Sequence, residues 1–540
     1  MPADPGAQGR RAELAALACA WLAVSCSGGA AGPPPLVCPA GEVPCGQVCL
    51  DVQSDPASCG GCGIPCWTDQ TCQAGSCVGG ASAIDAGVAS LPLVVTSAPG
   101  AYWSTGAPIV EASSATADVT VHDDAPAQVW EGFGGAFNEI GWNVLSLLSP
   151  ADRAQALQLL YGPDGARFAF GRIPIGASDY AMDRYTDDEV PAGATDPTLA
   201  AFSIDRDLIK LIPFIKAAQA VKPNIRFWAS PWTPPTWMKQ GPFSAGQMPT
   251  PFDGGSLATD PGTMTAFAQY LVKFVQAYAQ QGITVEVVSA QNEPNYTGTY
   301  PTCAWSPAPY TTFIGQYLGP AFAAAGLTTK IMLGTFNGGG SDPKIVSSVM
   351  ADPAARAAIQ VLGFQWGMQT QVAGARRYDL PVWQTEHRCG NYPWQSPFDA
   401  TAAPNDQAYA VESWGLIRDW IKAGVTAYSA WNMVLDTGGV GIDTTRVWPQ
   451  DALLTVDTTT QSLIVTPAYY VFRHVSRYVA QGAKVVATSG GDALAFKNPD
   501  GSLVAVMYNG GAARTTTVAM AGHRLQFTLP ASGWATVVAR

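Results

Sequence analysis

Basic residues are scarce in this chain of 540 residues. It contains 29 Lys and Arg against 41 Asp and Glu, which gives a formal net charge of -12 and a pI near 4.8. Recognition of nucleic acid or of an anionic membrane surface needs a cluster of cations that meets the phosphates, and this composition provides none. The charge balance therefore argues against both partners and favours a neutral substrate.

Histidine is rare as well, and long apolar runs are missing from most of the chain. The four histidines are scattered and show none of the paired spacings of metal sites, so we expect neither a catalytic metal nor a cofactor. After the first 30 residues no apolar run reaches the length of about 18 residues that a transmembrane helix requires. The mature protein is therefore expected to have no membrane span.

The first residues resemble an export signal. Arg10 and Arg11 precede the apolar run Leu14–Val24, which is too short to span a bilayer and is typical of a cleaved signal peptide. Leu-Ala-Val-Ser-Cys, ending at Cys26, is similar to a bacterial lipoprotein cleavage box, although a larger aliphatic residue is usual three positions before the cysteine. A lipoprotein signal and an ordinary signal peptide over residues 1–26 both stay open. Either predicts a secreted protein or a cell-surface or outer-membrane lipoprotein of a bacterium.

Cysteine is concentrated near the N-terminus, where ten of the 12 residues precede position 78. Eight of them crowd residues 38–78, with Gly and Pro between them. Such density in an exported chain predicts a disulfide-bonded module, whose pairing stays open. A zinc site that includes Cys59 and Cys62 is the alternative. The segment also resembles short cysteine-rich repeats in secreted proteins of myxobacteria.

Small residues and prolines surround this module, and strand-like patterns follow. Residues 27–37 and 79–106 are expected to be linkers because they are rich in Ala, Ser, Gly and Pro. Residues 107–129 contain a strand-like segment at 117–121, and residues 480–540 alternate with a period of two. We expect the last two regions to form one small β-sandwich, built from both flanks of the central body.

Residues 130–479 alternate between apolar strand-like runs and amphipathic stretches with apolar residues three and four apart. The eight expected strands are Gly132–Phe137, Phe168–Ala177, Arg226–Trp232, Thr284–Ala290, Lys330–Phe336, Gln360–Trp366, Pro381–Thr385 and Ala427–Val434. The clearest amphipathic stretches are Asp205–Ala220, Met264–Gln280, Tyr310–Ala325 and Gln407–Ala423. Eight repeats of strand then helix predict an α/β fold, the (β/α)8 TIM barrel. Its catalytic groups belong at the C-terminal ends of the strands.

Two glutamates follow the fourth and seventh expected strands. Glu293 stands in Gln-Asn-Glu-Pro and Glu386 in Gln-Thr-Glu-His, so both face one mouth of the predicted barrel. In a retaining glycosidase two carboxyl groups about 5 to 5.5 Å apart share the work. One protonates the leaving oxygen while the other attacks the anomeric carbon. His387 is expected to point to the opposite face of its strand and to serve in packing.

Seven motifs, in order along the chain, resemble glycoside hydrolase family 30, the glucosylceramidase-type family. They are Trp-Glu-Gly-Phe-Gly-Gly-Ala-Phe at 130–137, the segments at 171–180 and 229–239, the two glutamate motifs, and the segments at 428–432 and 470–478. The resemblance covers residues 130–540. It implies a TIM barrel with a side β-sandwich, and retaining hydrolysis of β-glycosides.

The resemblance also implies the roles of polar residues. Glu293 would be the acid/base and Glu386 the nucleophile, whose negative charge would raise the pKa of Glu293. Arg172 would hold Glu386 as a carboxylate, with a purely structural ion pair as the alternative. Asn292 would hydrogen-bond the sugar 2-hydroxyl, and Asp179 would bond another hydroxyl.

Aromatic residues at the strand ends complete the expected site. Trp232 and Trp431 offer apolar faces to a pyranose ring, with a place in the core as the alternative for each. Trp366 and Asn432 end the sixth and eighth strands and are also expected to contact substrate.

The chain departs from the family pattern in two places. Many members have His where this chain has Gln365, which puts in doubt the group that bonds the nucleophile or the sugar from that side. The first motif often carries Thr or Asp where this chain has Asn138 and Glu139.

These observations predict a secreted retaining β-glycosidase that acts on β-linked glucosyl units through a glycosyl-enzyme intermediate. A β-glucoside, a glucosylceramide-like glycolipid and β-1,6-glucan are all compatible as the carbohydrate partner. β-Xylosyl or β-galactosyl substrates, and a non-catalytic carbohydrate-binding protein, are the alternatives. The loop Cys389–Asn405, with Tyr392 and Trp394, is expected to wall the site and to decide among substrates.

Overall fold

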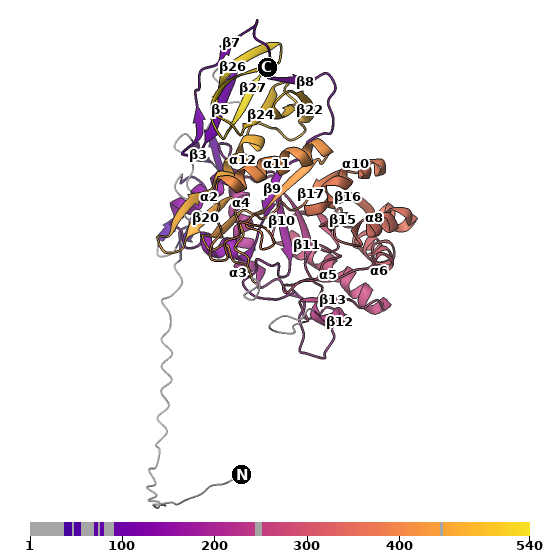
Figure 1. Ribbon diagram of the computed structural model, residues 1–540. Coiled ribbons are helices and arrows are strands. Elements are labelled where there is room, and N and C mark those ends of the chain that lie inside the picture. The colour runs from indigo at the N-terminus through magenta and orange to yellow at the C-terminus, as the bar shows by residue number, and fades with distance from the viewer. Residues whose placement is uncertain are drawn as a thin grey trace, which may run out of the picture.

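A barrel and a β-sandwich make up most of the computed structural model (Figure 1). The structure describes residues 37–45, 48–55, 70–73, 76–79, 91–243, 251–442 and 447–540. The predicted export signal at 1–26 lies outside the described residues. Within them, no helix combines the length and the apolar character that a bilayer crossing demands.

Two short hairpins are described in the cysteine-rich module. β1 (Val43–Cys45) pairs with β2 (Val48–Leu50), and β3 (Gln70–Gln73) pairs with β4 (Ser76–Gly79). Cys38 and Cys49 form a disulfide across a Cα–Cα distance of 5.5 Å. This bond supports the expected disulfide chemistry. The alternative zinc ligands Cys59 and Cys62 lie outside the described residues.

Eight parallel strands close the barrel, as the sequence predicts. Their order is β9, β10, β11, β14, β15, β16, β17, β18 and back to β9. The strands are β9 (Gly132–Ala136), β10 (Phe170–Ile175), β11 (Arg226–Pro231), β14 (Val285–Ser289), β15 (Lys330–Phe336), β16 (Ile359–Phe364), β17 (Val382–Gln384) and β18 (Ala427–Asn432). Each one overlaps the run expected from its apolar residues. The (β/α)8 fold is confirmed.

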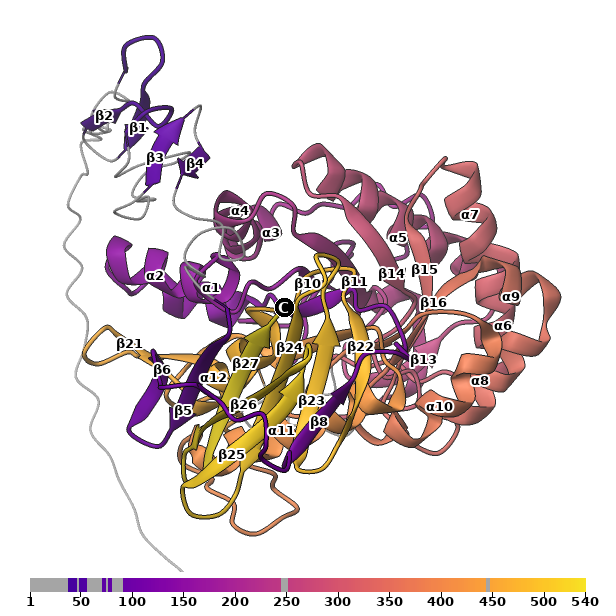
Figure 2. The ribbon, with the colours of Figure 1, turned by 90° about the horizontal axis from the view of Figure 1, so that it is seen from above.

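Helices follow the strands and cover the outside of the barrel (Figure 2). They are α1 (Glu139–Leu145), α2 (Pro150–Tyr161), α3 (Asp207–Lys210), α4 (Ile212–Val221), α5 (Pro261–Gln280), α6 (Pro307–Thr312), α7 (Gly319–Ala324), α8 (Asp342–Ala351), α9 (Pro353–Ala358), α10 (Val372–Ala375), α11 (Gln407–Ala423) and α12 (Pro467–Ser476). Shorter helical turns are η1 (Thr236–Met238), η2 (Phe313–Leu318), η3 (Trp366–Gln371) and η4 (Arg376–Tyr378). The Asp260 side chain accepts a hydrogen bond from the Thr263 N–H at the start of α5, and Gly424 ends α11 with a φ of 118°.

Two of the expected helices are interrupted. The stretch 205–220 is divided at Leu211 into α3 and α4, and the stretch 310–325 continues from α6 through a π-helical segment, η2, into α7. Pro213 and Pro320 lie in the first turns of α4 and α7. Because proline has no backbone N–H to donate, the regular α-helical hydrogen-bond pattern is interrupted near both residues, whatever the apolar spacing.

The lower part of the barrel interior is filled by side chains from seven strands. The cluster consists of Phe170, Trp228, Val287, Met332, Val361, Trp383 and Ala427, one from each strand except β9. Because side chains alternate along a strand, the residues two positions later face the interior above this layer. The lower interior of the barrel is therefore a packed core, and the barrel is open at the C-terminal ends of its strands.

The sandwich is one ten-stranded sheet folded over on itself, in the order β6, β5, β27, β24, β23, β22, β8, β25, β26, β7. Its strands are β5 (Leu93–Ala98), β6 (Ala101–Thr105), β7 (Val110–Glu111), β8 (Val119–His122), β22 (Lys484–Ser489), β23 (Asp492–Lys497), β24 (Leu503–Asn509), β25 (Arg514–Met520), β26 (His523–Leu529) and β27 (Gly533–Ala539). Val537 of β27 and Phe527 of β26 belong to one buried cluster, so the two ends of the sheet share a core. The strand expected at 117–121 corresponds to β8, which pairs with β22.

The remaining strands form two small sheets, one within the barrel sequence and one after it. β12 (Lys239–Phe243) and β13 (Gly254–Leu257) form a hairpin, while β19 (Val434–Asp436), β20 (Leu454–Asp457) and β21 (Ser462–Val465) form a three-stranded sheet after β18.

The prediction that residues 79–106 form a linker is wrong for the second half of this range. β5 pairs along β27, and Val94 and Val95 are 3% and 1% exposed. In β6, the Trp103 ring lies under the Arg473 guanidinium of α12, 3.8 Å from its Cζ. The apolar run in β5 is short and stands among small residues, so its local composition is that of a linker although its partner strand is at the far end of the chain. Figure 2 shows this indigo strand beside the yellow C-terminal strands.

We predict that the sandwich depends on β5 and β6. A chain that begins at residue 91 should keep the thermal midpoint of the full chain, since both strands stay in place. A chain that begins at residue 107 should fail to fold or melt at least about 5 °C lower, because burial of valines such as Val94 is lost and the edge of β27 is exposed. Thermal unfolding followed by circular dichroism makes the comparison, and equal midpoints would contradict it.

Candidate active site

Glu293 and Glu386 lie just past the C-terminal ends of β14 and β17, at the open end of the barrel. They are 7% and 6% exposed. The Glu293 N–H donates to the Thr335 carbonyl at 3.0 Å, which ties this tip to β15. Glu293 has a φ of 46°, and Trp366 beside it has a φ of 50°. Left-handed backbone is unfavourable for such residues and persists where the surrounding structure holds it.

A single guanidinium joins the two strand tips. Arg172 of β10 is fully buried. Its Nη1 donates to Glu386 Oε2 at 2.6 Å, and its Nη2 donates to Asn292 Oδ1 at 2.6 Å. The expected contact between Arg172 and Glu386 is present. A buried guanidinium in direct contact with the carboxyl group fixes its position and gives a charge-assisted hydrogen bond.

Aromatic rings enclose this guanidinium. The Arg172 Cζ lies 4.9, 4.4 and 5.1 Å from the ring centroids of Trp228, Trp232 and Trp431. Burial lowers the pKa of Arg172, and the charge of Glu386 opposes that shift. Cation–π contacts on several sides keep the charge in place without water.

Two consecutive residues after β16 each bind one glutamate. Gln365 Nε2 donates to Glu293 Oε1 at 3.1 Å, and Trp366 Nε1 donates to Glu386 Oε1 at 2.8 Å. The Gln365 amide is oriented by Thr385, whose Oγ1 donates to Gln365 Oε1 at 2.9 Å. Gln365 therefore supplies a hydrogen-bond donor to Glu293 without a titratable group. The sequence carried no signal for this contact, because its partners come from three strand ends.

The environment of Glu293 keeps its carboxyl group protonated. Its pKa is raised to about 8, first by burial and then by the charge of Glu386, with a smaller contribution from Asp179. The side chains of Gln365 and Asn337 oppose the shift by hydrogen bonding. The charge of Glu386 was expected to be the cause, but burial is the larger one.

The other polar residues expected in the site lie around this centre. Asn292 Oδ1 also accepts a hydrogen bond from Thr335 Oγ1 at 2.8 Å. Among the described residues no hydrogen-bond partner is found for the Asn292 side-chain nitrogen, so this is the atom that can bind a ligand. Asp179 follows β10 and is close enough to act on Glu293. Asn432 Nδ2 donates to Gln450 Oε1 at 2.8 Å. These contacts place the three residues near the site, and their binding of substrate stays a prediction.

Asn138 and Glu139, where the chain departs from the family pattern, make different contacts. Asn138 caps α1 and reaches Asn432, with 3.5 Å between Asn138 Nδ2 and Asn432 Oδ1. Glu139 turns away and forms an ion pair with Arg206 at 2.8 Å.

Trp232 and Trp431 are more deeply buried than a sugar platform needs. Their rings stack at 5.3 Å with an interplanar angle of 26°, and they are 1% and 3% exposed. Little of either residue is exposed to a ligand, and their role in holding the sugar stays a prediction. His387 packs outward as expected: its Nε2 lies 3.0 Å from Ser413 Oγ of α11, and burial lowers its pKa to about 3.

A cleft of about 520 Å³ opens beside Glu293. It is lined by Glu293, Tyr296, Tyr300, Asn337, Gly338, Gly339, Trp366, Gly367, Trp394 and Trp448. Trp394 confirms that the loop 389–405 walls the site. Trp448, Asn337 and the two tyrosines were not foreseen. Both tyrosines follow the glutamate motif closely, and that proximity was the one signal in the sequence that could have found them.

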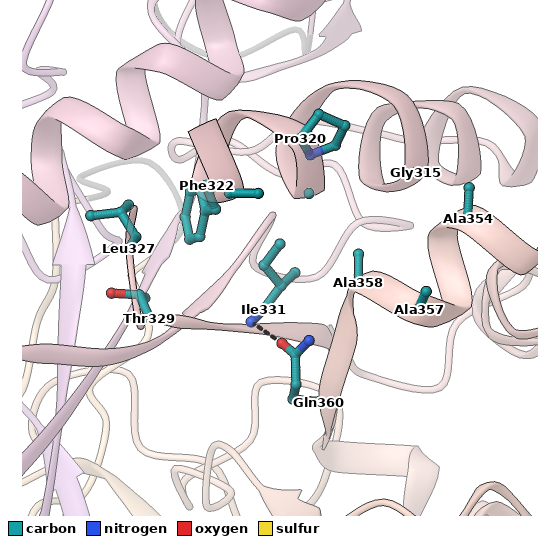
Figure 3. Close-up of a pocket in the computed structure, with 12 residues that line it drawn as sticks. Gly315, Pro320, Phe322, Leu327, Thr329, Ile331, Ala354, Ala357, Ala358 and Gln360 are labelled. Atoms are coloured by element: carbon teal, nitrogen blue, oxygen red, sulfur yellow. Dashed lines mark hydrogen bonds between the residues drawn. The ribbon is translucent and has the colours of Figure 1, made fainter. Parts of the chain in front are cut away.

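A second cavity, of about 430 Å³, lies at the opposite ends of the strands (Figure 3). Thr329 and Ile331 at the start of β15 line it together with small residues of η2 and α9, and the Ile331 N–H donates to Gln360 Oε1 at 2.8 Å. None of its 12 lining residues is an acid or a base. This cavity has no part in the chemistry at the other end of the barrel.

Comparison with known families agrees with this geometry. Residues 130–479 match the glycosyl hydrolase family 30 TIM-barrel domain, and residues 482–537 match the beta sandwich domain of the same family. The chain belongs to glycoside hydrolase family 30. It is therefore a glycoside hydrolase with a carbohydrate substrate, and the named relatives support a β-glycosidase.

Several family 30 relatives are similar over most of their length. Endo-1,6-beta-D-glucanase neg1 of Aspergillus fumigatus is 27% identical over 425 residues, which cover 74% of this chain and 82% of the relative. Lysosomal acid glucosylceramidase of Mus musculus is 27% identical over 419 residues, 72% of this chain and 77% of the relative. Among solved structures, SrfJ from Salmonella typhimurium has a TM-score of 0.72 at 25% identity and covers 83% of this chain and 99% of its own.

The pKa of Glu293 predicts the alkaline limit of activity. In its expected role as general acid Glu293 must carry its proton, so kcat/KM on a β-glycoside should fall as the pH rises through about 8. Gln365→Leu removes a hydrogen bond that lowers this pKa, so the limit should move to higher pH while kcat falls roughly tenfold or more. A pH–rate profile measures both effects.

Gln369→Leu is the matched control, since Gln369 is half-buried on the same helical turn, η3, and its Nε2 donates to the Asp419 carbonyl at 3.3 Å and not to either glutamate. It should leave the profile unchanged. A limit that moves to lower pH in Gln365→Leu would contradict the assigned contact.

Proposed function

We propose that this enzyme hydrolyses β-glucosidic bonds by double displacement, with Glu293 as acid/base and Glu386 as nucleophile. The observation that supports the division of roles is the contrast between two neighbouring carboxyl groups. Glu293 is buried with a pKa raised to about 8, while Glu386 lies 2.6 Å from the Arg172 guanidinium. One group is suited to give a proton and the other to attack as an anion.

The first half-reaction follows from these contacts. A Glu386 oxygen attacks the anomeric carbon, the bond to the leaving oxygen breaks, and the proton of Glu293 passes to that oxygen. Gln365 donates to Oε1 of Glu293, and Oε2, 3.5 Å from the Tyr300 hydroxyl oxygen, is the oxygen proposed to carry the proton. In the second half-reaction Glu293, now ionised, takes a proton from water, and the water oxygen displaces Glu386 from the sugar.

A glucosyl unit is the proposed sugar in the site. The support comes from relatives named as glucosylceramidase and endo-1,6-beta-D-glucanase, which are about equally similar to this chain. Xylosyl and galactosyl substrates are the alternatives within the same chemistry. A non-catalytic binding protein is disfavoured because both carboxyl groups and their partners are in place.

Trapping of the intermediate tests the proposal. Incubation with 2-deoxy-2-fluoro-β-glucosyl fluoride should add one fluoroglucosyl mass to the peptide that contains Glu386, because the fluorine slows hydrolysis of the ester more than its formation. Glu386→Gln is the matched control and should gain no mass. The xylosyl and galactosyl analogues run in parallel, and faster labelling by either one would overturn the glucosyl assignment. Absence of any label on the unaltered chain would overturn the mechanism.

We also propose that the protein is exported from a bacterial cell. The charged and apolar pattern before residue 26 and the Cys38–Cys49 disulfide support this location. Expression in a bacterial host should give a mature chain that lacks the first residues, as measured by intact mass. A lipoprotein would carry a lipid mass on Cys26 that Cys26→Ser removes, whereas an ordinary signal peptide would leave no such mass. An uncut chain in the cytoplasm would contradict export.

A further inference from the structure

The cleft beside Glu293 lies on one side of the reacting bond. Its lining includes the acid, Glu293, but not the nucleophile, Glu386. In a double displacement the acid faces the oxygen that departs, whereas the nucleophile faces the anomeric carbon of the sugar that stays. Trp366 marks the boundary, because its Nε1 binds Glu386 while the residue also lines the cleft. The cleft is thus placed where the leaving group departs.

The chemistry of the lining favours a sugar over an acyl chain. Five of the ten lining residues are aromatic, namely Tyr296, Tyr300, Trp366, Trp394 and Trp448. Leu, Ile, Val and Met are absent from these ten residues. Lipid chains are held by flexible aliphatic surfaces, whereas a pyranose ring presents a flat face of C–H groups with hydroxyls at its rim. The tyrosine hydroxyls and Asn337 supply polar groups of the kind that such a rim needs.

One wall of the cleft is rigid and carries an exposed ring. Trp448 is 7% exposed, and its Nε1 donates to the Gly390 carbonyl at 3.1 Å. Trp394 packs nearly perpendicular to it, with ring centroids 5.0 Å apart and an interplanar angle of 73°, and lies 5.4 Å from Tyr392. Trp394 is nevertheless 59% exposed. A large ring supported from behind and open in front is a surface suited to be covered by a ligand.

We propose that this cleft is a subsite for a sugar ring in the leaving group, and that Trp394 is its specificity-determining residue. This inference rests on the proposed double displacement. In the first half-reaction the sugar alcohol receives the proton of Glu293 and departs. In reverse, a sugar bound in the cleft gives its hydroxyl proton to Glu293 while its oxygen takes the glycosyl group from Glu386. A new glycosidic bond then forms, and no further reactant is needed.

Reactivation of the trapped enzyme tests the subsite separately from hydrolysis. The fluoroglucosyl-enzyme is freed of excess reagent and incubated in buffer, with methyl β-glucoside as a sugar acceptor, or with 1-hexanol as an alkyl acceptor. Methyl β-glucoside should accelerate the return of activity saturably, by roughly tenfold, and a fluorinated disaccharide product should form. The alkyl alcohol should have a smaller effect that does not saturate.

Trp394→Ala should abolish saturation by the sugar, which lowers the ratio of the sugar-dependent rate to the water rate by about tenfold. Trp394→Phe keeps a flat ring and should restore most of that ratio.

Three results would overturn the subsite: no saturation by the sugar in the unaltered enzyme, stronger acceleration by the alkyl alcohol, or full saturation in Trp394→Ala. The first two leave the labelled enzyme intact, so they contradict the subsite and not the mechanism. A protein that never takes up the label contradicts the mechanism, and the subsite with it.

Discussion

The active centre depends on one buried cation. Arg172 has no exposed surface, and a charge in such a place is strongly unfavourable unless it is paired and hydrogen-bonded. Its partners, Glu386 and Asn292, come from two different strand ends, so the guanidinium is satisfied only when the barrel closes in the correct register. The same contact that stabilises the closed barrel therefore sets the position of the Glu386 carboxyl group. The ion pair between Arg172 and Glu386 thus serves both the stability of the barrel and the arrangement of the site.

The position of this cation follows from the alternation of side chains in the barrel. On β10, Phe170 fills the lower layer and Arg172, two residues later, rises above it. On β11, Trp228 lies in that layer and Ser230 accepts from Arg172 Nη2 at 3.1 Å. Aromatic rings fill the layer below Arg172, and hydrogen-bonding groups surround it in the layer above. Fixed dipoles therefore take the place of water near the two glutamates, where charge develops in the reaction. Preorganised polar groups of this kind need no rearrangement during the reaction.

Local sequence patterns predicted the barrel and its two glutamates, because apolar runs and strand-end motifs are properties of short segments. What they missed depends on contacts between distant segments. β5 is a strand because β27 lies beside it, and nothing within residues 93–98 indicates that partner. Gln365 supports the acid because β14, β16 and β17 end close together. Burial is the largest cause of the raised Glu293 pKa, and burial is a property of the complete fold.

Tryptophan performs two tasks in this site, and burial separates them. Trp232 and Trp431 are enclosed and pack against the Arg172 guanidinium, so a change in either one disturbs the cation that pairs with Glu386. Trp394 stands on a loop, exposed by 59%, and none of its ring contacts involves that cation. Replacement of Trp394 therefore leaves the contacts of Arg172 in place, although it removes one ring contact of Trp366, which binds Glu386. Under the proposed mechanism, specificity for the leaving group can therefore change through this loop while Glu293 and Glu386 stay fixed.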